Sequence, residues 1–286
     1  MHGSGGNRRR WADLPAPVHD AVTEVLGSPV VRAVSQSGGF SPGAAERVVA
    51  ADGTRAFVKA VSAAQNPESP RLQEREARIT AALPAGVPAP GFRGARWVGD
   101  WHVLVLDEVP GHQPGLPWRA GDLGPVVAAL DRLVAVGTPC PVPDLPTARE
   151  ALAGELPEPA LDLLDGDSLV HLDLRADNLL LTPVGAVLVD WPHACRGPAW
   201  LDLLTLLAEV DRLGEEGLAE HVLTTSALTR HVEAEVLTTV LDGFRAFFLH
   251  RAAQPVPPGL PTLREFQRVQ GEALARWVGR RRAPAR

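Results

Sequence analysis

The sequence is poor in residues that could cross-link it. Its 286 residues include only two cysteines, Cys140 and Cys195, together with one methionine and no tyrosine. Two thiols so far apart form neither a disulfide framework nor a zinc-ligand pattern, and we expect both to be buried or unreactive. Scarce cysteine is typical of proteins in a reducing compartment, so we expect a cytoplasmic location.

Long apolar segments are lacking as well. No apolar run approaches the roughly 18 residues that a membrane-spanning helix needs. The N-terminal stretch MHGSGGNRRRW carries basic residues but no apolar core behind them, so it does not resemble a secretory signal. We therefore expect no membrane partner, and we expect residues 1–10 to form a flexible tail.

An excess of positive charge is also missing. The chain has 34 acidic and 28 basic residues, a net charge of −6, which gives no support to a nucleic-acid partner. Hydrophobic residues make up 45% and charged residues 22% of the chain, as in ordinary globular proteins. The length suits one large domain or two lobes.

The first part of the chain predicts an antiparallel sheet with helices. Two short strands surround Asp52-Gly53 and two more surround Gly99-Asp100, and both dipeptides are typical of tight hairpin turns. The remaining expected elements of this part are helices over 14–27 and 66–83, a strand over 30–37 and a glycine-rich turn over 37–43. A segment dense in proline and glycine, 109–117, predicts a hinge.

The rest of the chain predicts mostly helix. Helical patterns cover 122–137, further stretches after 147, and nearly everything after 200. The exception is 168–191, which predicts a loop followed by a short hairpin turning at 182–185. The fold class expected from this order is α+β, with a sheet-rich N-terminal part and a helical C-terminal part.

Polar residues are concentrated in the stretch HLDLRADN, 171–178, and in Asp190 at the end of the expected strand AVLVD, 186–190. The hairpin would return Asp190 to the vicinity of Asn178. An amide oxygen and a carboxylate that converge on one point suit Mg²⁺, which takes few protein ligands and leaves positions for water and phosphate. Asp173 could then orient a substrate hydroxyl, an arrangement suited to phosphoryl transfer.

These motifs carry a resemblance to a known family. HLDLRADN has the kinase pattern H-x-D-L-x-x-x-N, VDW follows at the end of a strand, and GPAWLDL leads into a helix. With twelve residues from Asp190 to Asp202, the chain resembles the aminoglycoside phosphotransferase family, which includes choline-kinase-like small-molecule kinases. The resemblance covers most of the chain. It implies a two-lobed protein-kinase-like fold, with an N-lobe over 11–109 and a C-lobe over 110–286.

The resemblance also implies roles for the residues of the motif. Asp173 would be the catalytic base, and Asn178 and Asp190 would hold Mg²⁺. His171 and Asp202 would support the catalytic loop through hydrogen bonds. For Arg175 two roles stay open, since it would either contact the γ-phosphate or brace the loop.

A nucleotide site is implied in the N-terminal part. Lys59, in the strand AFVKA, matches the lysine that pairs with the α- and β-phosphates, and it needs an acidic partner because its strand is otherwise apolar. Glu76 is the preferred partner and Glu74 the second. The backbone of the glycine-rich turn would cover the phosphates, and the adenine would lie against a hinge strand; the residues concerned are Ser37, Gly38, Gly39 and Phe40 in the turn and Leu106, Asp107, Glu108 and Val109 in the strand.

Other interpretations were weighed at these positions. Taken singly, Asp173 could be a turn residue, Asp202 a helix cap and Lys59 a lysine that reaches solvent. The stretch GFSPG, 39–43, has the hydrolase pattern G-x-S-x-G, but Pro42 has no N–H group for an oxyanion hole. It is the order and spacing of the whole set that favour the kinase-like interpretation.

A regulated protein kinase is disfavoured. Leu172 precedes Asp173 where protein kinases carry an arginine, and only eleven residues separate Asp190 from Asp202. The function expected is ATP-dependent, Mg²⁺-dependent phosphorylation of a hydroxyl on a small molecule, for example an aminoglycoside or other antibiotic. The alternative is a nucleotide-binding pseudokinase that acts as a sensor or scaffold. GTP in place of ATP, a role in resistance or in metabolism, and the oligomeric state stay open.

The acceptor cannot be named from the sequence. A polycationic acceptor would need clustered carboxylates, but an acidic run on helices is more often solvated; the residues are Glu209, Asp211, Glu215, Glu216 and Glu220. Aromatic residues could cage a quaternary ammonium or belong to the core; these are Trp191, Trp200, Phe247 and Phe248. The basic end RRRAPAR predicts a solvated helix end.

Overall fold

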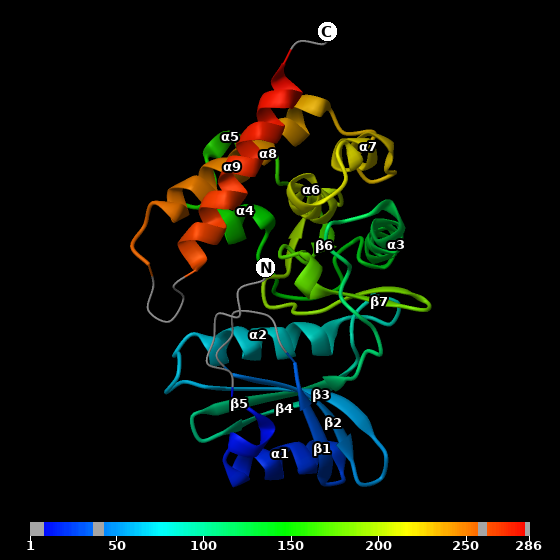
Figure 1. Ribbon diagram of the computed structural model, residues 1–286, viewed down its shortest axis with the longest axis vertical. Coiled ribbons are helices and arrows are strands. Elements are labelled where there is room, and N and C mark those ends of the chain that lie inside the picture. Colours follow the sequence, from blue (N-terminus) through cyan, green and yellow to red (C-terminus); the bar gives the residue numbers. More distant parts are fainter. Residues whose placement is uncertain (1–8, 37–42, 257–261, 284–286) are drawn as a thin grey trace. The chain divides into compact units, whose positions relative to one another are not determined.

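The computed structural model describes residues 9–36, 43–256 and 262–283 (Figure 1). The chain divides into two compact units. The first comprises 1–83, 89–111 and 189–192, and the second comprises 84–88, 112–188 and 193–286. The expected turn residues Ser37, Gly38, Gly39 and Phe40, and most of the expected tail, lie outside the described residues.

The first unit contains a five-stranded antiparallel sheet in the order β1-β2-β3-β5-β4. Its elements are η1 (Trp11–Asp13), α1 (Ala16–Leu26), β1 (Val30–Ser35), β2 (Ala44–Ala50), β3 (Arg55–Ser62), α2 (Ser69–Ala82), β4 (Phe92–Val98) and β5 (Trp101–Asp107). The hairpin predicted at Asp52-Gly53 connects β2 and β3. Gly53 adopts φ +89°, and the Asp52 carboxylate accepts a hydrogen bond from the Thr54 N–H at 2.9 Å. A side chain other than glycine would be strained there.

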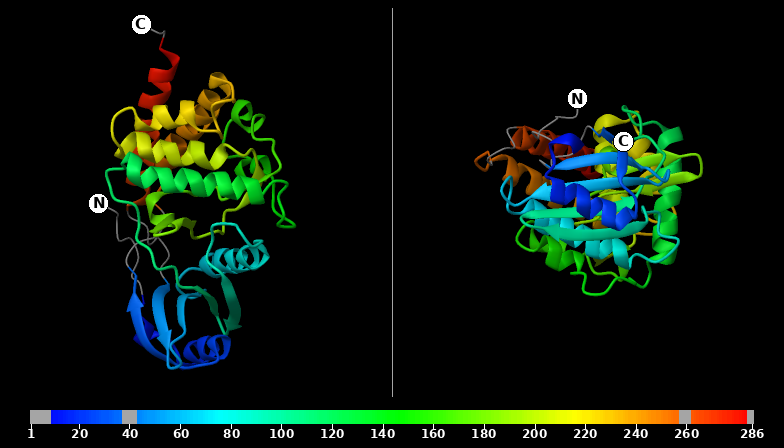
Figure 2. Two further views of the ribbon diagram at one scale, coloured as in Figure 1. Left: turned by 90° about the vertical axis from the view of Figure 1, so that its right-hand side faces the viewer. Right: turned by 90° about the horizontal axis from the view of Figure 1, so that it is seen from below.

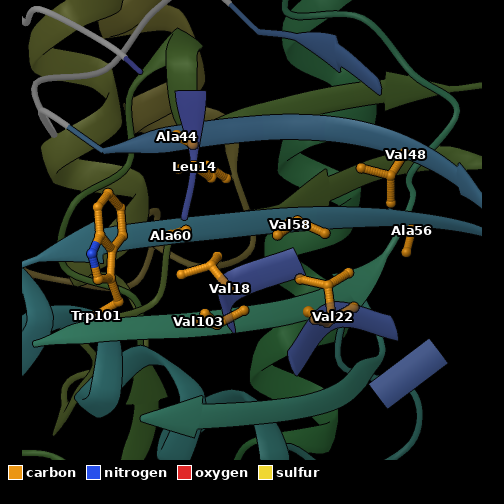
Figure 3. Packing of buried hydrophobic residues seen from close by; sticks show 11 residues of the cluster. Leu14, Val18, Val22, Ala44, Val48, Ala56, Val58, Ala60, Trp101 and Val103 are labelled. Carbon is orange, nitrogen blue, oxygen red and sulfur yellow. The ribbon is translucent and has the colours of Figure 1, made fainter. Parts of the chain in front are cut away.

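The two faces of this sheet are covered by different helices (Figure 1, Figure 2). On one face, Val18 and Val22 of α1 pack against Val48, Val58 and Val103 of the strands (Figure 3). On the other face, Ala77 of α2 packs against a second cluster, formed by Leu104 and Leu106 with Phe57 beside them. Successive side chains of a strand alternate between faces, so Lys59, two residues after Phe57, lies on the α2 face.

The second unit is mostly helical. Its elements are α3 (Ala120–Val136), α4 (Ala148–Leu152), α5 (Glu158–Leu161), β6 (Ser168–Val170), η2 (Ala176–Asn178), β7 (Leu179–Thr182), β8 (Gly185–Leu188), β9 (Cys195–Gly197), α6 (Leu201–Leu213), α7 (Leu218–Thr225), α8 (Ala234–Ala252) and α9 (Leu263–Arg282). The helices α8 and α9 lie side by side (Figure 1). Gly271 permits this, because a Cβ atom there would stand 2.7 Å from the Leu249 side chain.

The fold class predicted from the sequence is confirmed, since an antiparallel sheet with helices is followed by a mostly helical part. One strand boundary in the mostly helical part is wrong. The expected strand over 186–190 ends at Leu188, the last residue of β8 that pairs with β7, and Asp190 adopts φ +70° outside any strand. The physical reason is that β7 begins at Leu179, the partner of Leu188, so no strand residue is left to pair with Val189 or Asp190.

Two further features bear on the expectations from the sequence. The pairing of β6 with β9, Val170 opposite Cys195, was not predicted. Among the helices of the described ranges, none is long and apolar enough to cross a membrane.

Candidate functional site

The loop that follows β6 is fixed by a carboxylate from α6. Asp202 is 4% exposed, and its two oxygens each accept one backbone hydrogen bond at 2.8 Å, Oδ2 from the His171 N–H and Oδ1 from the Leu172 N–H. Leu172 adopts φ +66°. A non-glycine residue in that conformation costs about 1–3 kcal/mol, and the paired hydrogen bonds hold it there. Burial raises the pKa of Asp202 to about 6, although both N–H groups act to lower it.

Asp173 lies in the middle of this loop beside Asn178. The Asn178 amide donates from Nδ2 to the backbone oxygen of Asp173 at 2.8 Å and to its Oδ2 at 3.1 Å. The N–H of Asp173 donates to Nδ1 of the buried His171 at 3.3 Å. The Asp173 side chain remains 34% exposed. The loop thus presents one partly solvated carboxylate with its backbone fixed on both sides.

Arg175 is held within the same loop. Its Nε lies 3.2 Å from Oδ1 of Asp177 and 3.8 Å from Oδ1 of Asp173. Its guanidinium carbon is 5.9 Å from the ring centroid of Phe266 in α9. These contacts place a cation next to Asp173, where it can brace the loop or meet an anionic group.

Glu209, one of the residues of the acidic run, holds the loop 171–178 at Ala176. Glu209 of α6 is 5% exposed, and its Oε2 accepts from the Ala176 N–H at 2.8 Å and from Trp118 Nε1 at 3.2 Å. The signal in the sequence that could have identified Glu209 was its spacing. It lies seven residues after Asp202, which places both carboxylates on the same side of one helix.

Two other carboxylates of the acidic run are ion-paired. Asp211 pairs with Arg280 at 2.5 Å, and Glu220 pairs with Arg281 at 2.5 Å and accepts from Trp277 Nε1 at 2.8 Å. The predictions of a solvated acidic run and of a solvated basic end are wrong for Asp211 and Arg281, whose side chains are 16% and 8% exposed, whereas Glu220 and Arg280 remain 45% and 58% exposed. Glu215 and Glu216 are exposed.

The aromatic residues named as cage candidates differ in burial. Trp191 and Trp200 are buried. Phe247 and Phe248 of α8 are partly buried and contact each other edge to face, with ring centroids 5.0 Å apart.

A separate charged cluster lies in the first unit. Lys59 Nζ of β3 donates to both oxygens of Glu76 in α2, at 2.7 and 2.8 Å, and to Oδ1 of Asp190 at 2.7 Å. Of the two candidate partners, Glu76 forms this pair, whereas Glu74 accepts from Trp97 Nε1 at 2.9 Å. Burial acts to lower the pKa of Lys59, but the two carboxylates outweigh burial and raise it, so the ammonium group stays charged.

The two carboxylates of this cluster differ in burial. The Glu76 side chain is 3% exposed and the Asp190 side chain 42%. Burial raises the pKa of Glu76, and Lys59 opposes that rise. Glu76 is therefore the permanent partner of Lys59, because without the ammonium group its charge would be buried and uncompensated.

The helix α2 is anchored one turn earlier by Gln73, which the sequence analysis did not identify. Its Nε2 donates to the backbone oxygens of His102 at 2.9 Å and Lys59 at 3.3 Å, and lies 3.0 Å from His102 Nδ1. The amide thus ties α2 to β3 and β5 beside the charged cluster.

Of the residues expected in the hinge strand, Leu106 and Asp107 end β5, whereas Glu108 and Val109 lie beyond it, so the expected strand is two residues too long. Leu106 is buried, and the Asp107 carboxylate pairs with Arg93 at 2.6 Å. Glu108 pairs with Arg55 at 2.5 Å and Arg47 at 3.5 Å. Since the acidic side chains are engaged in ion pairs, any contact of this segment with a nucleobase would come from backbone groups, among them those of Val109.

The predicted metal ligands belong to different units, Asn178 to the second and Asp190 to the first. In the described part of the chain, no cluster of three or more histidine, cysteine, aspartate or glutamate side chains forms a cation site. The assignment of Asn178 and Asp190 to Mg²⁺ stays a prediction.

Comparisons with known proteins concern both the motif and the fold. Residues 115–236, which include the loop 171–178 and Asp202, match the model of a phosphotransferase enzyme family. No curated protein matches the chain. Solved structures similar in fold at low identity include the following three. A choline/ethanolamine kinase family protein from Mesorhizobium loti has a TM-score of 0.60 at 14% identity, covering 93% of this chain and 99% of that chain.

The other two structures are antibiotic phosphotransferases. A thermostable mutant of an aminoglycoside phosphotransferase, in a ternary complex with AMP-PNP and hygromycin B, has a TM-score of 0.57 at 13% identity, covering 95% of this chain and 100% of that chain. Macrolide 2′-phosphotransferase type I has a TM-score of 0.54 at 19% identity, covering 93% of this chain and 96% of that chain. The resemblance to the aminoglycoside phosphotransferase and choline kinase-like family is confirmed: the chain has their protein-kinase-like fold, and its residues 115–236 match the phosphotransferase enzyme family.

Proposed function

We propose that the protein is an ATP-dependent phosphotransferase that phosphorylates a hydroxyl group of a small molecule. The observation that carries the proposal is the loop 171–178, in which Asp173 is partly exposed, paired with Asn178 and fixed from behind by Asp202. A carboxylate presented in this way can accept the proton of a hydroxyl as that oxygen attacks a phosphoryl group.

The charged cluster of the first unit supports nucleotide binding. Lys59 carries a positive charge, held in place by the buried Glu76, and an ammonium group so fixed suits the phosphates of a nucleotide. The aminoglycoside phosphotransferase of similar fold was crystallised with AMP-PNP. The backbone of 106–109 would contact the base, which leaves GTP as an alternative donor. The turn residues Ser37, Gly38, Gly39 and Phe40 stay predicted phosphate contacts.

The residues assigned to Mg²⁺ have suitable chemistry. Asn178 directs its nitrogen to Asp173, so the amide oxygen is the atom that it would offer to a cation. Asp190 offers a carboxylate that is 42% exposed. One amide oxygen and one carboxylate fit a hard cation that keeps water and phosphate as its other ligands. When bound, Mg²⁺ would neutralise charge on the phosphates.

The acceptor is proposed as a class. The three similar structures are described as acting on, or binding, different acceptors, so they support a small hydroxylated molecule without choosing among aminoglycosides, macrolides and amino alcohols. The ion pairs of Asp211 and Glu220 weigh against a polycation recognised by that acidic run. A role in antibiotic resistance and a cytoplasmic location stay predictions.

The test is ADP release from ATP and Mg²⁺ across a panel of aminoglycosides, macrolides, choline, sugars and nucleosides. Asp173→Ala should lower acceptor-dependent turnover by about 100-fold or more, the contribution typical of a general base, while nucleotide binding persists. The exposed Asp167 of the same unit provides the control Asp167→Ala, which should change nothing. Unchanged turnover in Asp173→Ala would refute the base assignment. ATP binding without ADP release for any acceptor would favour the pseudokinase.

A further inference from the structure

The helix α6 directs two buried carboxylates toward the loop 171–178. Asp202 and Glu209 are seven residues apart, which is about two turns of an α-helix, so they lie on the same side of α6 about 10 Å apart along its axis. Asp202 accepts the N–H groups of His171 and Leu172, and Glu209 accepts the N–H of Ala176. One rigid helix therefore fixes the loop before and after Asp173.

The bond to Ala176 lies at a point where the backbone needs an acceptor. Ala176 is 1% exposed and is the first residue of η2, preceded by Arg175 in an extended conformation (φ −150°, ψ 167°). The first N–H groups of a helix have no acceptor within the helix. Glu209 supplies that acceptor from outside, so the position of η2 depends on the Glu209 carboxylate.

The short helix η2 carries Asn178. The N–H of Asn178 donates to the Arg175 oxygen at 3.0 Å, and its side chain donates to both the backbone and the carboxylate of Asp173. A displacement of Ala176 would therefore be transmitted through Asn178 to Asp173. The connection runs from Glu209 to Ala176, then through η2 to Asn178, and ends at the proposed base.

We infer that Glu209 is a positioning residue for phosphoryl transfer, which fixes Asp173 and Asn178 through the Ala176 N–H. The inference rests on the proposed function. The positioning role depends on one atom, Oε2 of Glu209, because both Trp118 Nε1 and the Ala176 N–H donate to it. A glutamine with its amide oxygen in that place would keep both hydrogen bonds.

Two other roles for Glu209 have to be separated from this one. Glu209 could serve only to satisfy the indole N–H of Trp118, which is fully buried. It could also serve as a countercharge for the neighbouring Arg212, whose pKa is lowered by burial and raised by Glu209. Each role predicts a different response to substitution.

The experiment measures kcat, the KM for ATP and the melting temperature for a small set of variants. Glu209→Gln keeps the oxygen and its reach but removes the charge, whereas Glu209→Asp keeps the charge but shortens the reach. Trp118→Phe removes only the indole donor. The control is Asp211→Asn, which removes a carboxylate that the same helix uses in a surface ion pair. All rates are taken below the melting temperature of each variant.

A positioning role predicts that Glu209→Gln retains kcat within about 3-fold, while Glu209→Asp loses about 10-fold or more in kcat with the KM for ATP changed by less than about 3-fold. Trp118→Phe and Asp211→Asn should retain kcat. A loss of kcat in Glu209→Gln with retention in Glu209→Asp would overturn the inference in favour of the countercharge. An equal loss in Trp118→Phe would overturn it in favour of the tryptophan contact. Full activity in all variants would also refute it.

Failure of the inference is distinguishable from failure of the proposed function. Asp173→Ala is measured in parallel. If it is inactive and Glu209→Asp is fully active, only the positioning role is refuted. If Asp173→Ala is active, the base assignment is refuted and the positioning role with it. If the unaltered chain releases no ADP with any acceptor, the proposed function itself is refuted.

Discussion

Asp202→Asn is expected to gain stability relative to the unaltered chain as the pH rises, and to lower turnover. Burial raises the pKa of Asp202 from 3.8 to about 6, so the folded chain binds this proton more tightly than the unfolded chain does. The stability that this group contributes is complete below pH 3.8 and is lost as the pH rises through 6. Above that range, folding with Asp202 ionised costs about 3 kcal/mol, at about 1.4 kcal/mol for each pKa unit.

An asparagine resembles the protonated aspartate, because each has one accepting oxygen and one donor. As the pH rises from 5 to 7, Asp202→Asn should therefore gain about 1 kcal/mol of stability relative to the unaltered chain. A cost of about 1–3 kcal/mol applies at every pH, because the amide accepts only one of the two N–H bonds. Turnover should fall by about 10-fold or more, because one of the two N–H groups at His171 and Leu172 loses its acceptor and the left-handed backbone at Leu172 is no longer held.

The assay is urea unfolding followed by circular dichroism at pH 5, 6, 7 and 8, with turnover measured on the same preparations. Asp20→Asn, which replaces an exposed aspartate of α1, is the control, and it should show no pH-dependent difference from the unaltered chain. A stability difference that does not shift in favour of the variant between pH 5 and pH 7 would refute the reasoning about burial. Unchanged turnover would refute the reasoning about the loop.

Three other substitutions test the first unit. Lys59→Met should lower the free energy of unfolding by about 3–5 kcal/mol, since it leaves the buried carboxylate of Glu76 without its cation. It should also abolish turnover. A variant as stable as the unaltered chain would contradict the pairing of Lys59 with Glu76. Gln73→Leu should cost about 1–3 kcal/mol, because the backbone oxygens at Lys59 and His102 lose a donor, and should raise the KM for ATP in steady-state assays. Gly43→Ala should cost about 1–3 kcal/mol through overpacking, since its Cβ would collide with the backbone of Ala60, and urea unfolding measures that loss.

The parts of the fold that were predictable from the sequence depend on local chemistry. Asp52-Gly53 specifies a turn whatever surrounds it, and alternation along β3 is enough to place Lys59 on the face opposite Val58. A lysine on an apolar strand face needs a carboxylate, and the helix that covers that face offered Glu74 and Glu76. The preference for Glu76 came from the resemblance to the family's helix pattern, and the second partner of Lys59, Asp190, was not predicted.

The features that were missed depend on partners distant in sequence. In the sequence, Glu209 is indistinguishable from an acidic residue on the surface of a helix. It accepts the Ala176 N–H only because α6 packs against the loop 171–178. Arg281 stands in a run that is typical of a solvated helix end, yet its side chain is 8% exposed and paired with Glu220. Charge and helical periodicity describe a residue's own element, and they carry no information about which backbone donors another element leaves unsatisfied.

The loop 171–178 depends on α6 for a similar physical reason. Leu172 has a positive φ value without being glycine, and η2 is a single short turn, so the loop lacks the regular hydrogen bonds of a helix or strand. Its N–H groups must be accepted by something that does not move. A carboxylate on a long helix meets this need better than one backbone oxygen, because it offers two charged oxygens, and Glu209 Oε2 alone accepts two bonds. The energetic cost of burying Asp202 is then the consequence of holding the loop 171–178 in a conformation that it would not adopt alone.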